Sequence, residues 1–240
     1  MTNENIQEFI DRLNNGQFKD TILLRQISEY VFVSKVRQKK NDLRNEPKFS
    51  LTYYDFFFIK NDKGEFVGAV VDMYSDLHWY ITPKNRKKGY LVNALRSAIL
   101  PYIFYDDNKD LEAQRITITK SEIGELDYHN SKKVALKLGF KATNKEEAEF
   151  LLTRDSFDWS EENINEINTC LNEEKLNEFR KRISYIYQDL ESMTHELQMA
   201  YGDIYEIESL KELSNKLCCS KATIEDIIWE NNKVYNKRRP

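Results

Sequence analysis

The chain has 240 residues, of which 32% are charged and 40% are hydrophobic, with a net charge of −4 at pH 7. This length suits one large domain or a domain with an appendage, and the composition is that of a globular rather than a disordered protein. No apolar run approaches the roughly 18 residues of a membrane helix, and the first residues lack the pattern of a signal peptide. We therefore expect no membrane partner.

The three cysteines indicate a reducing compartment. Cys218 and Cys219 are adjacent in the sequence, and Cys170 has no neighbour at a spacing typical of metal sites. Neither arrangement favours a disulfide framework or a metal cluster. We expect a cytoplasmic protein without a bound metal.

Two kinds of apolar periodicity divide the first 160 residues. Steps of three and four predict helices, and runs rich in β-branched and aromatic residues predict strands. Pro83 ends one strand, Gly139 ends one helix, and Asn61-Asp62-Lys63-Gly64 predicts a hairpin turn. In chain order we predict helices over 4–14 and 24–40, strands over 55–60, 66–74 and 76–82, a helix over 90–105, a strand over 115–119, a helix over 131–138 and a strand over 149–153.

This order predicts the fold class. Antiparallel strands followed by alternating strands and helices imply an α+β fold with a mixed, mostly antiparallel sheet flanked by helices. The β pattern stops after Trp159. We expect a domain over residues 1–158, a long helix over 159–205 and a small helical hairpin over 206–240.

The long helix carries a heptad pattern. Apolar residues alternate steps of three and four, which is typical of a coiled-coil seam or of a helix lying on the domain. A homodimer through residues 176–200 is therefore a candidate. The seam residues are Leu176, Phe179, Ile183, Ile186, Leu190, Met193, Leu197 and Ala200.

Residues 209–228 resemble a helix-turn-helix, with Cys218 where glycine usually makes the turn. The second helix would present Glu225 and Asp226 to a groove, and carboxylates facing phosphates are unfavourable. The partner of residues 206–240 is therefore DNA or, equally well, a protein.

The stretch from Ile81 to Leu95 predicts an anion site. It reads as a strand end, a basic loop and a helix that opens on Gly89. The first turn of a helix leaves backbone N–H groups without partners and carries partial positive charge. Glycine lets an anion approach the backbone closely, and Arg86, Lys87 and Lys88 add charge. This pattern suits a pyrophosphate.

Several motifs together resemble the GCN5-related N-acetyltransferase family over residues 50–155. Ile81-Thr82-Pro83 followed by Arg86 to Tyr90 is similar to the family's acetyl-CoA motif, and Ser131 to Phe140 is similar to its later S-x-x-v-a-x-k-L-G-F segment. The order and spacing look most like the branch that acetylates N-terminal amines of ribosomal and related proteins. Leu91 departs from the family's small residue, Tyr128 replaces its asparagine, and Ala135 replaces its proton-donating tyrosine.

The resemblance implies acetyl-CoA as cosubstrate and an amine as acceptor. It implies that the amides of residues 88–91 hold the pyrophosphate and that the strand edge binds the pantetheine arm as an added strand does. The implied cofactor-binding residues are Tyr80, Ile81, Thr82, Arg86, Lys87, Lys88, Gly89, Tyr90, Leu91, Asn130 and Ser131.

Acetyl transfer to an amine requires a base near neutral pKa and a donor for the oxyanion. His78, Tyr80 and Thr82 share one face of a strand, so His78 is a candidate base. Glu122 is its rival, and Ser131 or a solvent proton would protonate the thiolate.

We expect an acetyl-CoA-dependent N-acetyltransferase that acts on a protein N-terminus, a lysine or a small amine. The alternative is an acetyl-CoA-sensing or inactive relative that binds DNA or a protein through its C-terminal helices. Acetylation of aminoacyl-tRNA is less favoured because the first domain is not strongly basic.

Overall fold

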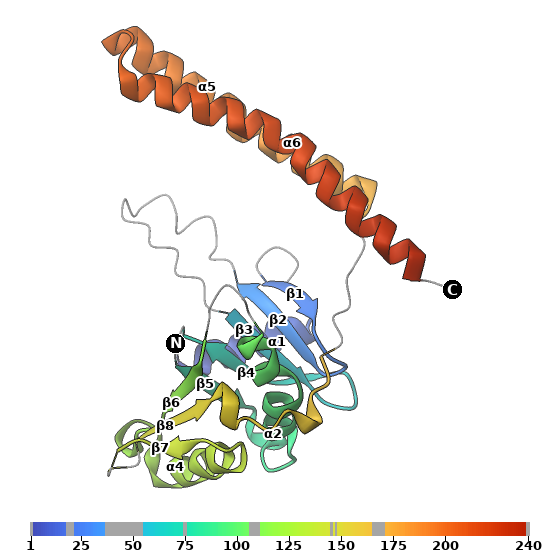
Figure 1. The fold of residues 1–240 in the computed structure, drawn as a ribbon, viewed down its shortest axis with the longest axis vertical. Coiled ribbons are helices and arrows are strands. Elements are labelled where there is room, and N and C mark those ends of the chain that lie inside the picture. Colours follow the sequence, from blue (N-terminus) through green and yellow to red (C-terminus); the bar gives the residue numbers. More distant parts are fainter. Residues whose placement is uncertain are drawn as a thin grey trace. The chain divides into compact units, whose positions relative to one another are not determined.

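The computed structural model describes residues 2–17, 22–36, 55–73, 76–105, 111–144, 146, 148–164 and 171–238. The chain divides into two compact units, Met1–Ile167 and Asn168–Pro240. Figure 1 shows the first as a mixed layer of strands and helices and the second as two long helices. Each unit is described by itself.

The first element confirms the helix predicted over residues 4–14. Helix α1 spans Asn3–Asn14, and its N-terminus has a capping box in which Thr2 and Asn5 satisfy each other's backbone N–H groups. Ile6, Ile10 and Leu13 follow at steps of three and four and are buried. These residues form the stripe with which α1 covers the sheet.

The first sheet has five antiparallel strands in the order β1-β2-β3-β4-β5. The strands predicted over 55–60, 66–74 and 76–82 are confirmed as β3, β4 and β5. The bounds are Ile22–Gln26 for β1, Val31–Val36 for β2, Asp55–Lys60 for β3, Phe66–Asp72 for β4 and Leu77–Ile81 for β5.

The helix predicted over 24–40 is wrong, because this segment forms the hairpin of β1 and β2. Leu24 pairs with Ser34 across it, and the Ile27 N–H donates to the Val31 carbonyl at 3.0 Å. Val31 and Val33 are two residues apart, are both buried, and have the β-branching that favours strands. The apolar residues of this short segment are spaced both two and three apart, so they fit the period of a strand as well as that of a helix. Residues 37–40 lie outside the described ranges.

The second sheet has three antiparallel strands in the order β6-β8-β7. Strand β6 spans Ala113–Thr117, two residues earlier than predicted, β7 spans Lys141–Ala142, and β8 spans Glu149–Thr153 as predicted. A parallel bridge between Asp76 and Arg115 joins the two sheets. The α+β fold with mostly antiparallel pairing is therefore confirmed, with two sheets in place of one.

Helical segments cover the sheet face opposite α1. The helix predicted over 90–105 consists of α2 at Tyr90–Ala94, a π-helical turn at Leu95–Ile99 and α3 at Leu100–Phe104. Pro101 cannot donate a helical hydrogen bond, and the π turn directly precedes it. Single turns of 3₁₀ helix span Pro83–Asn85, Arg154–Ser156 and Trp159–Glu161.

Helix α4 spans Lys120–Lys137 and is longer than the helix predicted over 131–138. Gly124 interrupts it with φ of 78° and ψ of 161°. Such a break conceals the helix in the sequence, since glycine lowers helix propensity. Gly139 follows the helix with φ of 92°, as its predicted capping role requires.

Two apolar clusters fill the two faces of the first sheet. Phe56 and Phe58 point toward α1, and Phe57 and Ile59 point toward α2, α3 and α4. Phe9 of α1 packs edge-on against Phe56 at 5.6 Å between ring centroids. The aromatic strand β3 is therefore core on both faces.

The second unit is a hairpin of two antiparallel helices, α5 at Glu173–Tyr201 and α6 at Tyr205–Arg238. Gly202 ends α5 with φ of 77°. Arg180 near the start of α5 donates to Glu225 near the end of α6 at 2.7 Å. A long helix is confirmed, but it spans residues 173–201 in place of the predicted 159–205, and Trp159–Glu161 form a single 3₁₀ turn.

The helix-turn-helix predicted over 209–228 is wrong, because all of these residues lie within α6. Cys218 replaces the glycine that would end a first helix, so nothing breaks the backbone ladder there. The face of α6 turned toward α5 repeats at steps of three and four throughout. Its residues are Ile207, Leu210, Ser214, Leu217, Lys221, Ile224 and Ile228.

Helix α6 uses only part of the predicted seam of α5. Six residues of α5 that recur at steps of three and four are buried or half-buried along the hairpin: Leu176, Arg180, Ile183, Tyr187, Leu190 and Thr194. Phe179 of the predicted seam is also half-buried. Ile186 and Met193 of the predicted seam remain 55% and 53% exposed.

Among the described residues, no helix has the length and apolar character of a membrane span.

Gly68 on β4 tests the packing of β4 against β5. A Cβ at Gly68 would lie 2.8 Å from the Tyr80 carbonyl oxygen and would overlap the Ile81 side chain. We expect Gly68→Ala to lower the free energy of unfolding of this unit by about 1–3 kcal/mol, the usual cost of overpacking. Urea denaturation measures it, with Lys63→Ala in the exposed turn as control. An unchanged midpoint for Gly68→Ala would contradict the register of β4 and β5.

Ser214 tests the hairpin. Its hydroxyl oxygen is buried in the seam and has no hydrogen-bond partner in the described part of the chain. We expect Ser214→Ala to stabilise the hairpin by about 1 kcal/mol, because an unsatisfied hydroxyl is removed. Thermal melting followed by circular dichroism measures the gain. Ser209→Ala, at an exposed position of α6, is the control. An equal gain in stability there would mean that the higher helix propensity of alanine, and not the removal of a buried hydroxyl, explains the result.

Candidate functional site

The loop after β5 presents a helix N-terminus built on two residues with positive φ. Lys87 has φ of 61° and Gly89, the N-cap residue of α2, has φ of 85°. A left-handed conformation is ordinary for glycine and costly for a branched residue. Gly89 has no side-chain acceptor, so the N–H groups of the first turn of α2 have neither a cap nor an intrahelical partner. The loop therefore offers unpaired donors to an anion.

Three cations surround this turn, and two of them are held in place. The Arg86 guanidinium donates from Nε to the Ile81 carbonyl at 3.2 Å and from Nη1 to Asp127 Oδ1 at 3.2 Å. Lys88 Nζ donates to Asn85 Oδ1 at 3.2 Å. Lys87 is exposed. The loop carries a positive potential on the side where the α2 N–H groups point.

A cavity of about 320 Å³ adjoins this loop and brings together most of the predicted site. Its walls come from β5, the loop, the start of α2 and the middle of α4, together with Asn3 of α1. Predicted residues that line it are His78, Tyr80, Ile81, Arg86, Lys87, Lys88, Gly89, Tyr90, Leu91, Asn130 and Ser131. Thr82 and Glu122 are not among the lining residues.

Thr82 is buried, and its hydroxyl accepts a hydrogen bond from Asn85 Nδ2 at 2.9 Å. This bond closes the turn that aims the loop at the cavity. The Thr82 side chain therefore holds the loop, and the expectation that the Thr82 backbone, as part of the strand edge, binds a cofactor stays a prediction.

Sequence reasoning missed Trp79, Asp127 and Lys133, which also line the cavity. Trp79 alternates with His78 on β5, so its position could have been inferred from the period of two. Asp127 lies on the early part of α4, which was not predicted, whereas Lys133 lies within the predicted helix but was not assigned to the site. No local pattern connects Asp127 with Arg86, 41 positions away.

The edge of β5 that faces the cavity is largely open. On its other edge, β5 pairs with β4 from Leu77 to Ile81. Toward β6, the pairing among the described residues is the bridge of Asp76 and Arg115, beyond which β6 pairs with β8. An open edge is a template for an extended ligand that carries amide groups.

His78 and Tyr80 lie on one face of β5, as predicted, and both contact α1. His78 Nε2 lies 3.2 Å from Asn3 Oδ1, and the Tyr80 hydroxyl donates to Gln7 Oε1 at 2.7 Å. Burial lowers the pKa of His78 below its ordinary value of 6.5, although Asp76 and Glu122 act in the opposite direction. A neutral imidazole can accept a proton at neutral pH.

Ser131 lies on the opposite side of β5, on α4. Trp79 Nε1 donates to Ser131 Oγ at 3.4 Å, a long hydrogen bond that leaves the hydroxyl proton free to be donated. Glu122, the rival base, is exposed near the start of α4. His78 is therefore better placed than Glu122 to act on a molecule inside the cavity.

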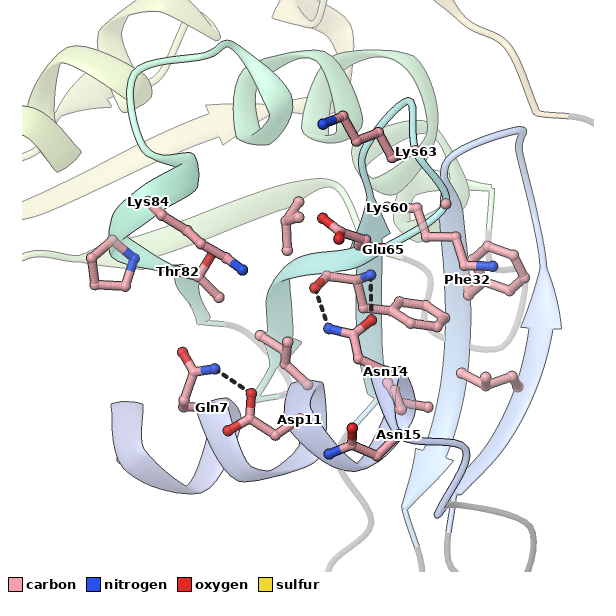
Figure 2. A pocket seen from close by; sticks show the side chains of 17 residues that line it. Gln7, Asp11, Asn14, Asn15, Phe32, Lys60, Lys63, Glu65, Thr82 and Lys84 are labelled. Atoms are coloured by element: carbon pink, nitrogen blue, oxygen red, sulfur yellow. Dashed lines mark hydrogen bonds between the residues drawn. The ribbon is translucent and has the colours of Figure 1, made fainter.

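A second, larger cavity of about 990 Å³ lies on the α1 side of the first sheet. Figure 2 shows Asn14 at its wall, where the amide exchanges two hydrogen bonds with the Phe66 backbone at 2.8 and 2.9 Å. Both lysines and carboxylates line it, including Lys60, Asp11 and Glu65. Its mixed charge gives no preference for an anion, in contrast to the basic loop.

No group of three or more His, Cys, Asp or Glu that could hold a metal occurs among the described residues. Comparison of the chain with protein-family models, with curated proteins and with solved structures finds no match.

The lowered pKa of His78 has a consequence for stability. The unfolded chain binds a proton at the ordinary pKa of 6.5, whereas folded His78 binds it only at lower pH. Stability from neutral His78 is therefore present above pH 6.5 and lost as the pH falls through this window toward the folded pKa. We expect acidification to destabilise the wild type more than His78→Gln.

Urea unfolding at a series of pH values measures this difference. A Trp229→Phe background confines the fluorescence signal to Trp79 and Trp159 of the first unit. His129→Gln is the control, because His129 is exposed beside Glu125. A difference between wild type and His78→Gln that does not change with pH would contradict the burial of the imidazole.

Proposed function

We propose that the cavity beside β5 binds acetyl-CoA and that the protein transfers the acetyl group to an amine. The observation that supports this most is the combination of an uncapped helix N-terminus, an open strand edge and a basic loop around one cavity. The helix N-terminus suits the pyrophosphate, and the open strand edge suits the amide groups of the pantetheine arm. The basic loop suits the negative charge of the phosphates.

The phosphate end would lie on the loop. The N–H groups of residues 88–91 would donate to the pyrophosphate oxygens, and Lys87 and Lys88 would neutralise charge. Arg86 is already oriented by the Ile81 carbonyl, so only its contact with Asp127 would be exchanged for phosphate. The Leu91 side chain departs from the family pattern, but its backbone N–H is still in the first turn of α2.

The acyl end would lie along β5, between His78 and Ser131. His78 would take the amine proton directly or through a water molecule as the amine nitrogen attacks the thioester carbonyl. A backbone N–H of β5 would donate to the developing oxyanion. As the carbon–sulfur bond breaks, the thiolate would take a proton from Ser131 or from solvent. The acceptor is a protein N-terminus, a lysine or a small amine.

An acetyl-CoA sensor without transferase activity is the second candidate. Ala135 stands where the resemblance expects a proton-donating tyrosine, and Ala135 is fully buried in the core. A sensor and an enzyme would share the same binding site, so binding and turnover must be measured separately.

Calorimetric titration with acetyl-CoA and with CoA tests the binding site. We expect wild type to bind both and Gly89→Val to lose at least tenfold in affinity, about 1.4 kcal/mol, because valine resists the left-handed conformation that aims the α2 N–H groups. Gly64→Val is the matched control, since Gly64 has φ of 80° and open space around it in a remote turn. Equal affinity in Gly89→Val and wild type would overturn the phosphate assignment.

Turnover tests the transferase. With N-terminal peptides and small amines as acceptors, we expect His78→Gln to reduce kcat by about 10²–10⁴, the usual contribution of a general base. The same variant should leave the affinity for CoA unchanged. Tight acetyl-CoA binding without acetyl transfer to any acceptor would favour the sensor.

A further inference from the structure

The helical hairpin has a row of exposed and half-buried apolar side chains beside its seam. On α5 the row consists of Ile186 and Met193, which are exposed, and Phe179, which is half-buried, and each lies one position before a seam residue. On α6, Leu213 and Ile227 also immediately precede seam residues and are 53% and 54% exposed. We call these five residues the outer stripe.

The two halves of the outer stripe lie on the same side of the hairpin. Two antiparallel helices are exchanged by a twofold rotation about an axis normal to the plane that contains them. This rotation leaves residues above the plane above it and residues below the plane below it. Equivalent heptad positions therefore share a side. The other flank is polar and includes Glu225, which pairs with Arg180. The side that carries the outer stripe is thus the more apolar one, although Glu206 and Ser220 of α6 share the heptad position of Leu213 and Ile227.

Charged residues border the outer stripe in an ordered way along α5. Lys175, Arg182, Asp189 and Glu196 recur every seven residues, and all lie on the side of the stripe away from the seam. The first two are basic and the last two are acidic. When two such helices lie antiparallel, each basic residue of one therefore faces an acidic residue of the other.

We propose that two copies of this chain associate through their outer stripes, with α5 antiparallel to α5 of the second copy, to form a four-helix bundle. Lys175 would face Glu196 of the second copy, and Arg182 would face Asp189. Symmetry repeats both pairs, so all four border positions would have an opposite charge across the interface.

The charges fix both the direction and the register of this packing. A shift of one heptad in either sense would place Asp189 opposite Asp189 or Arg182 opposite Arg182. Like charges across an interface disfavour that register. A parallel arrangement would bring the border residues toward the heptad position of Glu173, Arg180, Tyr187 and Thr194 of the other copy. Only Lys175 would meet an opposite charge there, and Arg182 would approach Arg180.

The same observations favour a second copy over another occupant. The order of the border charges is complementary to the same order read in the opposite direction. A surface that binds an unrelated protein does not require this property. Within one chain, Lys175 and Arg182 both contact the exposed Glu178. Such exposed pairs are weak, so a carboxylate from a second copy can compete for them.

Sedimentation equilibrium of the full chain over a range of concentrations tests the proposal. We expect wild type to dimerise and Arg182→Asp to dissociate roughly tenfold more readily, because it would face Asp189. The double variant Arg182→Asp/Asp189→Arg restores opposite charges and should regain the wild-type constant. Recovery in the double variant would show that the single variant is weakened by a charge conflict at the interface and not by a folding defect.

Ile186 provides a second test, because it lies at the middle of the proposed interface. Ile186→Glu should be monomeric, and Tyr185→Glu should remain dimeric because Tyr185 lies on the outward face and is 66% exposed. Circular dichroism should show the same helix content in both. A wild type that is monomeric at all concentrations overturns the proposal. So does a dimer that tolerates Ile186→Glu, or a double variant as weak as Arg182→Asp.

Discussion

The arrangement of the first unit depends on the bridge between Asp76 and Arg115, where the two sheets meet. The Asp76 carboxylate accepts a hydrogen bond from the Thr117 N–H at 2.9 Å, so a side chain of one sheet holds the backbone of the other. Beyond this point β5 continues along β4, and β6 continues along β8. The edge of β5 becomes available to a ligand because the two sheets part here, and the cavity follows from that separation.

Much of this architecture could be predicted from the sequence where one period dominated. Strands β3, β4 and β5 and helix α1 have long apolar runs with clear ends, and their predictions were confirmed. The segment of β1 and β2 failed because its apolar residues suit two periods, and the choice is made by pairing with β3 rather than by local preference. The pattern over 131–138 marks only the last part of helix α4, and the beginning of the helix contains the break at Gly124, after which the chain resumes its helix.

The site divides in the same way. The loop around Gly89 is recognisable because its residue types are tied to local backbone geometry, and the structure adds a positive φ at Gly89 that was not predicted from the sequence. The contact of Arg86 with Asp127 depends on how α4 crosses the end of β5, which no local pattern encodes. The period of two places the Thr82 side chain on one face of β5, but it cannot show that the chain turns at Pro83 and that the Thr82 hydroxyl bonds to Asn85.

The contact between Arg86 and Asp127 also shapes how the loop would meet an anion. The two side chains are 40% and 42% exposed, so water screens their attraction and the pair contributes little to stability. The Ile81 carbonyl holds Nε of the same guanidinium from within the turn. Arg86 is therefore oriented by a neutral acceptor and only loosely paired with a charged one. A phosphate can replace the carboxylate without reorganising the arginine, which lowers the cost of binding by leaving little of the loop to be ordered.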